Sequence, residues 1–157
     1  MPDLNIGWKE WVALPDLNIP AVKAKVDTGA RTSALHASRI EPITRPSGEW
    51  VRYVVHPLRK HPEIKIQCES KLLDRRDIKD SGGHVERRYV IETTVVLGVR
   101  VWTVALSLTH RGDMLFRMLL GRTALSDSIT VDPGKKYLAG KARLKKCYPE
   151  LKTGRPK

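Results

Sequence analysis

The amino-acid sequence predicts an all-β protein, a closed β-barrel with one short helix. Short runs rich in Val, Ile, Thr and Trp recur along the chain, as is typical of strands. Turn-forming residues separate these runs at short intervals, and little of the chain has helical periodicity. Frequent short strands joined by turns favour a barrel, and a chain of 157 residues is expected to form one domain.

The first half of the chain predicts four strands in two pairs. Residues 8–14 form the first strand, which ends at the turn Pro15-Asp16-Leu17-Asn18. Residues 21–27 form the second strand. Residues 50–55 and 64–68 are expected to form the second pair, joined by a loop that contains two prolines.

The second half predicts a long hairpin followed by short elements. Residues 71–84 form a polar stretch that ends in Ser81-Gly82-Gly83. Strands at 85–97 and 99–108 meet at Gly98, which favours a hairpin. The remaining expected elements are a buried strand at 114–120, a helix of one or two turns at 122–127, and a short strand at 129–131 before the turn signal Asp132-Pro133-Gly134.

The charge of the chain is strongly positive and unevenly placed. A net charge of +12 favours an acidic partner, either nucleic acid or an acidic peptide. About half of it lies in residues 141–157, where seven Lys or Arg residues oppose one glutamate. We therefore divide the chain into a domain spanning 1–140 and a basic C-terminal tail spanning 141–157, which we expect to be mobile.

Membrane spans, secretory signals and metal sites leave no signature in the sequence. No apolar run reaches the roughly 18 residues of a membrane-spanning helix. The first residues lack the basic and apolar regions of a secretory signal, so a cytoplasmic location is expected. Cys68 and Cys147 do not have the spacing of metal ligands and are expected to be reduced thiols. We expect neither a metal nor another cofactor.

The stretch Asp27-Thr28-Gly29-Ala30 carries the most chemical information. The preceding strand has Val22, Ala24 and Val26 on one face and delivers Asp27 into a tight glycine turn. Amide hydrolysis without a metal needs a base for water and an acid for the carbonyl, and two adjacent carboxylates that share one proton supply both. Asp27 would provide one carboxylate, and Gly29 would offer its backbone N–H to it.

A second motif, Met118-Leu119-Leu120-Gly121-Arg122, follows the first some ninety residues later. It is an apolar strand that ends in glycine, and Gly121 would let this strand pass the aspartate turn without an obstructing side chain. Together, the two motifs resemble the retroviral-type aspartic peptidases, the retropepsins. That resemblance implies a water-activating aspartate paired with a second one, hence a homodimer when each chain has one, and a Thr28 that locks the paired loops across the two-fold axis.

Longer strings of the sequence resemble one bacterial and archaeal subgroup of these enzymes. The match spans about residues 8–138 and includes 25–37, 86–90, 118–122 and 131–133. This subgroup is often labelled "ATP-dependent zinc proteases" and is found beside ATP-grasp glutamate ligases. The resemblance implies an aspartic endopeptidase that hydrolyses oligoglutamate tails added to a ribosomal protein, with such a ligase as a further partner. The chain itself has neither an H-E-x-x-H zinc motif nor a G-x-x-x-x-G-K-[S/T] phosphate loop.

Arg31 marks a difference from the viral enzymes. There, an acidic residue at this position pairs with the arginine after the apolar strand, but here Arg31 and Arg122 are both cationic. Two guanidinium groups near a catalytic aspartate favour a substrate rich in carboxylates. Ala30 has no hydroxyl that could donate to the aspartate and favour its charged form, which fits activity near neutral pH.

The candidate site therefore has three groups of residues. Asp27, Thr28 and Gly29 are the catalytic candidates, and Leu120 and Gly121 are structural neighbours. His36 is included among the substrate candidates, although a hydrogen bond near the site or a surface position would also explain it. The substrate-binding candidates are Ala30, Arg31, Thr32, His36, Arg88, Arg111 and Arg122.

Three alternatives remain open in the sequence. Asp80-Ser81-Gly82 also fits the aspartate pattern, but no apolar strand precedes it, and we interpret it as a loop tip that could belong to a flap. The whole chain could also be a non-catalytic basic β-barrel that binds RNA or the ribosome. An aromatic content of 6% and the lack of an aromatic-rich strand argue against RNA binding. A metallopeptidase is a third, weaker alternative.

Overall fold

The computed structural model describes residues 3–79, 82–110, 115–126 and 128–153, and strands make up most of them. The predicted all-β class is confirmed. The described residues also contain 3-10 turns at Pro15–Leu17 and Arg122–Ala124. The strands and helices are β1 (Leu4–Gly7), β2 (Lys9–Leu14), β3 (Ile19–Asp27), β4 (Ser33–Arg45), β5 (Gly48–Val55), β6 (Ile66–Lys71), β7 (Asp74–Lys79), β8 (Val85–Leu97), β9 (Arg100–Thr109), β10 (Met118–Gly121), β11 (Ile129–Asp132), α1 (Leu144–Cys147) and α2 (Glu150–Thr153).

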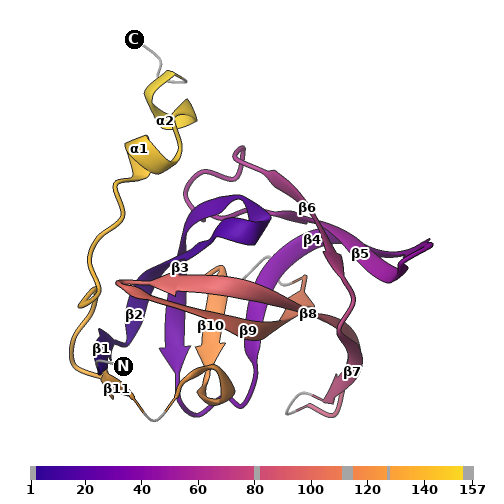
Figure 1. Ribbon diagram of the computed structural model, residues 1–157, viewed down its shortest axis with the longest axis horizontal. Helices are drawn as coiled ribbons and strands as arrows, with labels where there is room; N and C mark the ends of the chain where they lie inside the picture. Colours follow the sequence, from indigo (N-terminus) through magenta and orange to yellow (C-terminus); the bar gives the residue numbers. More distant parts are fainter. Residues whose placement is uncertain (1–2, 80–81, 111–114, 127, 154–157) are drawn as a thin grey trace.

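The main sheet closes on itself (Figure 1). Its strands follow the order β10-β3-β2-β8-β9-β4-β5-β6, and β10 also pairs with β4. That extra pairing joins the path into a ring of β10, β3, β2, β8, β9 and β4, around one apolar core. β5 and β6 extend the sheet beyond the ring, while β1 and β11 form a separate parallel pair.

β3 explains how an apolar strand carries a carboxylate to the surface. Val22, Ala24 and Val26 are buried, while Lys23 and Asp27 are half-buried and Lys25 is exposed. This alternation packs one face of the strand into the core and leaves the other outside, at about 25 cal/mol per Å² of buried apolar surface. Asp27 is the last residue of the strand, so its side chain is fixed by the packing of those before it.

Three strands, β1, β4 and β7, were missed in the sequence. β4 begins with five consecutive buried residues, 33–37, and therefore shows no alternation there. β7 is highly charged, so no apolar pattern marks it in the sequence. It is a strand because its backbone pairs with β8, from Asp74↔Val90 to Lys79↔Val85. Residues 74–79 of the polar stretch 71–84 thus form one arm of a β-hairpin with β8.

The helical segment predicted at 122–127 is shorter than expected. Its described residues form a single 3-10 turn, Arg122–Ala124, with no side-chain cap and no buried residue. Without a cap or a buried face, a helix this short gains little stability. The α-helical turns lie instead in the basic C-terminal segment.

That segment is packed against the sheet in its described part. Tyr148 is buried, and its hydroxyl donates to the backbone oxygen of Ala21 at 2.5 Å. A small apolar cluster of Ala21, Leu58, Ile64 and Tyr148 surrounds this contact. The division of the chain at residue 140 stays a prediction. Among the described residues, no helix has the length and apolar character needed to cross a bilayer.

A buried carboxylate joins the two ends of the domain. Glu10 is fully buried, and its side chain accepts backbone hydrogen bonds from Gly7 at 2.7 Å, Leu138 at 2.9 Å and Ala139 at 3.1 Å. Three such bonds replace the water that a buried charge loses. Glu10 therefore connects the β1–β2 junction to the chain that leads to the basic segment.

A histidine cluster lies at the end of β10 opposite to Asp27. The ring of His36 is 5.8 Å from that of His110 and 6.0 Å from that of His56, between centroids, and Arg117 is close by. Burial, followed by the charges of Arg117, His110 and His56, lowers the pKa of His36 from 6.5 to about 4. His36 is therefore neutral in the folded protein at neutral pH.

We expect this cluster to make the protein less stable in acid. The unfolded chain takes up a proton on His36 near pH 6.5, whereas the folded protein does so only near pH 4. The free energy of unfolding should therefore fall as the pH is lowered from 6.5 to 4, with a contribution of up to about 3 kcal/mol from His36. Denaturant unfolding at several pH values measures it.

His36→Asn should flatten this pH dependence, whatever its effect on stability at pH 7. His61→Asn is the control, because the His61 side chain is 42% exposed on a loop. An equal slope for wild type and His36→Asn between pH 6.5 and 4 would contradict the assignment.

Candidate active site

Asp27 lies in a tight turn directly after β3. Its Oδ1 accepts a hydrogen bond from the backbone N–H of Gly29 at 3.0 Å, and its backbone oxygen accepts one from Ala30 at 3.2 Å. Thr28 and Gly29 are exposed at the tip of the turn, while Asp27 is half-buried. The turn thus holds one oxygen of the carboxylate and leaves the side chain accessible.

β10 passes directly beside this turn. It runs parallel to β3, with Gly121 opposite Asp27, and antiparallel to the start of β4. The Gly121 N–H donates to Ser33 Oγ at 3.0 Å, and the Arg122 N–H donates to the Ala30 oxygen at 2.8 Å. Hydrogen bonds on both sides of β10 therefore join the two sequence motifs into one rigid unit.

Gly121 sits where the two segments cross. A Cβ at this position would lie 2.6 Å from the backbone oxygen of Thr32 and 2.9 Å from that of Ala30. Such distances are far below a van der Waals contact, and both neighbours are backbone atoms. Only glycine fits here without displacing the turn that carries Asp27.

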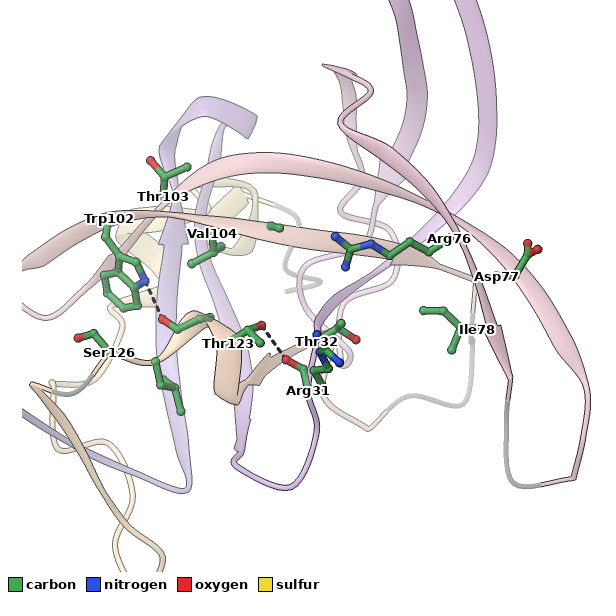
Figure 2. A pocket seen from close by; sticks show the side chains of 13 residues that line it. Arg31, Thr32, Arg76, Asp77, Ile78, Trp102, Thr103, Val104, Thr123 and Ser126 are labelled. Carbon is green, nitrogen blue, oxygen red and sulfur yellow. Dashed lines mark hydrogen bonds between the residues drawn. The ribbon is translucent and has the colours of Figure 1, made fainter.

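A cavity of about 840 Å³ opens next to the Asp27 turn (Figure 2). Arg31 and Thr32 form one side of it, β9 and the turn after β10 form another, and β7 overhangs it from the hairpin with β8. Two hydrogen bonds hold the turn after β10 in place: Trp102 Nε1 of β9 donates to the Ala124 oxygen at 2.9 Å, and Thr123 Oγ1 donates to the Arg31 oxygen at 2.7 Å.

The charged residues that line this cavity are Arg31, Arg76 and Asp77, which give it a net positive charge, and Asp77 Oδ1 lies 3.3 Å from Arg87 Nε. Arg31 is exposed and makes no ion pair with any described residue. Arg76 extends from β7 towards the space above Arg31 and Thr32, and its Nε lies 3.0 Å from Asp74 Oδ2. Arg122 is beside the cavity, and its Nη1 donates to the Gly29 oxygen at 3.3 Å. The cavity therefore suits a ligand that carries carboxylates.

The structure brings most of the sequence-predicted residues together, with three exceptions. Residues 27–32 and 120–122 lie together where the paired strands β3 and β10 end. His36 belongs to the histidine cluster, three residues beyond Ser33 and away from the turn. Arg88 is on the β8 side of the hairpin, where its Nε lies 3.3 Å from Glu86 Oε2. Arg111 lies outside the described residues, as do Asp80 and Ser81 of the second aspartate motif.

Sequence reasoning missed the residues that other elements contribute. Arg76 and Ile78 reach the cavity because β7 is a strand, and the hairpin could not be recognised in a charged stretch. Ser33 and Thr123 act through hydrogen bonds between distant segments. The sequence signal that could have identified them is their place shortly after the two motifs, Ser33 after the first and Thr123 after the second. Over the ranges that the structure describes, no three His, Cys, Asp or Glu side chains are grouped so that they could hold a metal ion.

Comparisons with known proteins agree with this arrangement. Residues 5–142 match the family model described as RimB-like, retropepsin-like aspartic endopeptidase RimB. A protein of Shewanella halifaxensis is 48% identical over 135 residues, which are 86% of this chain and 30% of that protein. One from Desulfotalea psychrophila is 43% identical over 151 residues, 94% of this chain and 32% of that protein. Both are named probable alpha-L-glutamate ligase, and the chain spans about a third of their length.

A solved structure has the same fold. The crystal structure of a Legionella pneumophila protein of unknown function superposes with a TM-score of 0.70 at 28% identity, covering 87% of this chain and 98% of that one. The likeness therefore extends over most of this chain.

Proposed function

This chain belongs to the RimB-like family of retropepsin-like aspartic endopeptidases, and on that basis we propose that it is an aspartic-type peptidase that works as a homodimer. Asp27 from each of two chains forms the catalytic pair. The observation that supports this best is the parallel pairing of β3 with β10, which holds an accessible carboxylate in a turn where only glycine fits at the neighbouring position.

The two carboxylates divide the chemistry between them. Held close together, they share one proton, because both cannot ionise at such a short distance. The ionised one takes a proton from a bound water, and the protonated one donates to the carbonyl oxygen of the scissile bond. The water oxygen bonds to the carbonyl carbon, and breakdown of that adduct releases the amine once its nitrogen is protonated.

The dimer follows from the count of carboxylates. Each chain supplies a single Asp27 turn, and Thr28 and Gly29 are exposed at its tip. A two-fold axis beside this tip would place the two Asp27 side chains face to face, with Thr28 bonding across the axis.

The substrate that fits the cavity is an acidic peptide, and we infer oligoglutamate. Arg31 has no ion-pair partner among the described residues, and a glutamate carboxylate would provide one. The relatives named as glutamate ligases support the same polymer, because a peptidase acting on it would reverse what a ligase builds. A glutamylated ribosomal protein in the cytoplasm, with the ligase as a possible second partner, is the corresponding cellular substrate.

The test is hydrolysis of a decaglutamate peptide, followed by mass spectrometry, with sedimentation of the enzyme under the same conditions. We expect cleavage of decaglutamate, none of a decaglutamine control, and activity only in the dimer. A monomer with full activity, or salt-sensitive binding of RNA without any hydrolysis, would overturn the proposal.

A further inference from the structure

A second basic cavity lies on the outside of the barrel, away from the Asp27 turn. It has a volume of about 350 Å³ and is enclosed by β2, β3, the loop between β5 and β6, the residues just before β10, and Leu144 of α1. We call it the basic pocket. Its charged lining residues are all cationic: Lys9, Lys23, Arg59, Lys60 and Arg117.

Within the described part of the chain, these cations lack negatively charged partners. None of the five makes an ion pair with a described residue. The ammonium groups of Lys9 and Lys23 both lie over the ring of Tyr137, at 5.4 and 5.8 Å from its centroid. The ring orients the two charges side by side but does not neutralise them.

Arg117 carries the clearest signal of a missing anion. Its Nε and Nη1 are buried and have no hydrogen-bond partner among the described residues. Burial, and then the charge of nearby Arg59, lowers the pKa of Arg117. Two buried guanidinium nitrogens next to a second cation are costly unless an acceptor other than the described residues reaches them.

The register of β3 connects the basic pocket to the proposed catalytic residue. Lys23, Lys25 and Asp27 alternate with buried residues, so their side chains share the outer face of the strand. Lys9 on β2 pairs with Lys25, and Trp11 pairs with Lys23. Lys23 precedes Asp27 by four residues, about 13 Å along a strand. A row of positive charge thus leads from Asp27 to the basic pocket.

We propose that Lys25, Lys23 and the basic pocket form a second binding site, which holds the carboxylates of an acidic peptide chain while a distant bond of the same chain lies at Asp27. An extended peptide advances about 3.3 Å per residue, so the chain must extend about four residues beyond the cleavage site to reach the basic pocket. This inference rests on the proposed function for the identity of the peptide. It adds a dependence on chain length that the cavity next to Asp27 does not provide.

The test compares triglutamate with decaglutamate as substrates. We expect wild type to cleave decaglutamate with a kcat/KM about tenfold higher per bond, mainly through KM, as for two partly exposed charge pairs. Lys23→Gln/Arg59→Gln should reduce this ratio to near one. The charge-matched control is Lys71→Gln/Lys135→Gln, whose lysines are exposed and lie outside the basic pocket, and it should keep the ratio.

Binding to the Asp27→Asn protein separates this inference from the proposed function. Fluorescence anisotropy of labelled decaglutamate should give a Kd about tenfold weaker after Lys23→Gln/Arg59→Gln, whether or not wild type hydrolyses the peptide. Cleavage with a ratio that both double variants share would overturn the second site and leave the peptidase. Tighter binding of single-stranded RNA than of decaglutamate, lost in the same variant, would also overturn it.

Discussion

Asp27→Asn protein is expected to fold like wild type but to hydrolyse decaglutamate about a thousandfold more slowly. The amide of asparagine keeps an oxygen that can accept the hydrogen bond from Gly29, which is 3.0 Å long in wild type. It cannot take a proton from water, and loss of general acid–base catalysis costs about 10² to 10⁴ in rate. Peptide cleavage at matched protein concentration measures the loss.

Mixing the two proteins tests whether the site is shared. If each site needs Asp27 from two chains, a dimer of one wild-type and one Asp27→Asn chain is inactive. In an equal mixture that has exchanged subunits, about a quarter of the dimers have two wild-type chains. We therefore expect about a quarter of the activity of pure wild type at the same total protein concentration. A loss in simple proportion to the wild-type fraction would show that each chain acts alone.

Asp80→Asn is the matched control for this experiment. Asp80 stands in the competing Asp-Ser-Gly motif, outside the described residues, and the same change of charge there should leave hydrolysis within about twofold of wild type. Activity that is lost with Asp80→Asn and kept with Asp27→Asn would transfer the catalytic role to Asp80.

The sequence was informative where chemistry depends on neighbouring residues. The alternation of Val22, Ala24 and Val26 predicted β3, and the burial of these residues confirms it. Gly98 predicted the β8–β9 hairpin, where it adopts a φ of +62°. Both are local patterns, which a single strand or turn determines by itself.

It was uninformative where pairing between distant segments decides the structure. β7 is a strand because β8 provides a complete ladder, including the pair Arg76↔Arg88, although like charges opposite each other disfavour a sheet. Salt bridges of Arg76 with Asp74 and of Arg88 with Glu86 offset that repulsion. Likewise, the placement of His36 depends on its contacts with His56 and His110, which no spacing in the sequence reveals.

Gly121→Ala is expected to have the largest effect on stability of any single methyl group added near the site. The new Cβ would lie 2.6 Å from the oxygen and 2.7 Å from the carbonyl carbon of Thr32, and 2.9 Å from the oxygen of Ala30. Backbone atoms cannot rotate away as a side chain can, so the turn or β10 must shift. We expect unfolding to be about 3 kcal/mol easier, with a matching loss of hydrolysis.

The control is Gly134→Ala, which adds the same methyl group where there is room. Its Cβ would be 3.5 Å from Asp132 Oδ1, an ordinary contact. Denaturant unfolding should therefore leave Gly134→Ala close to wild type and shift the midpoint of Gly121→Ala to lower denaturant. Equal midpoints for all three proteins would mean that there is more space between Gly121 and the backbone of Ala30 and Thr32 than the structure has. In that case glycine would not be what holds the Asp27 turn in place, and the rigidity assigned to the site would have to come from the hydrogen bonds of Ser33 and Ala30 alone.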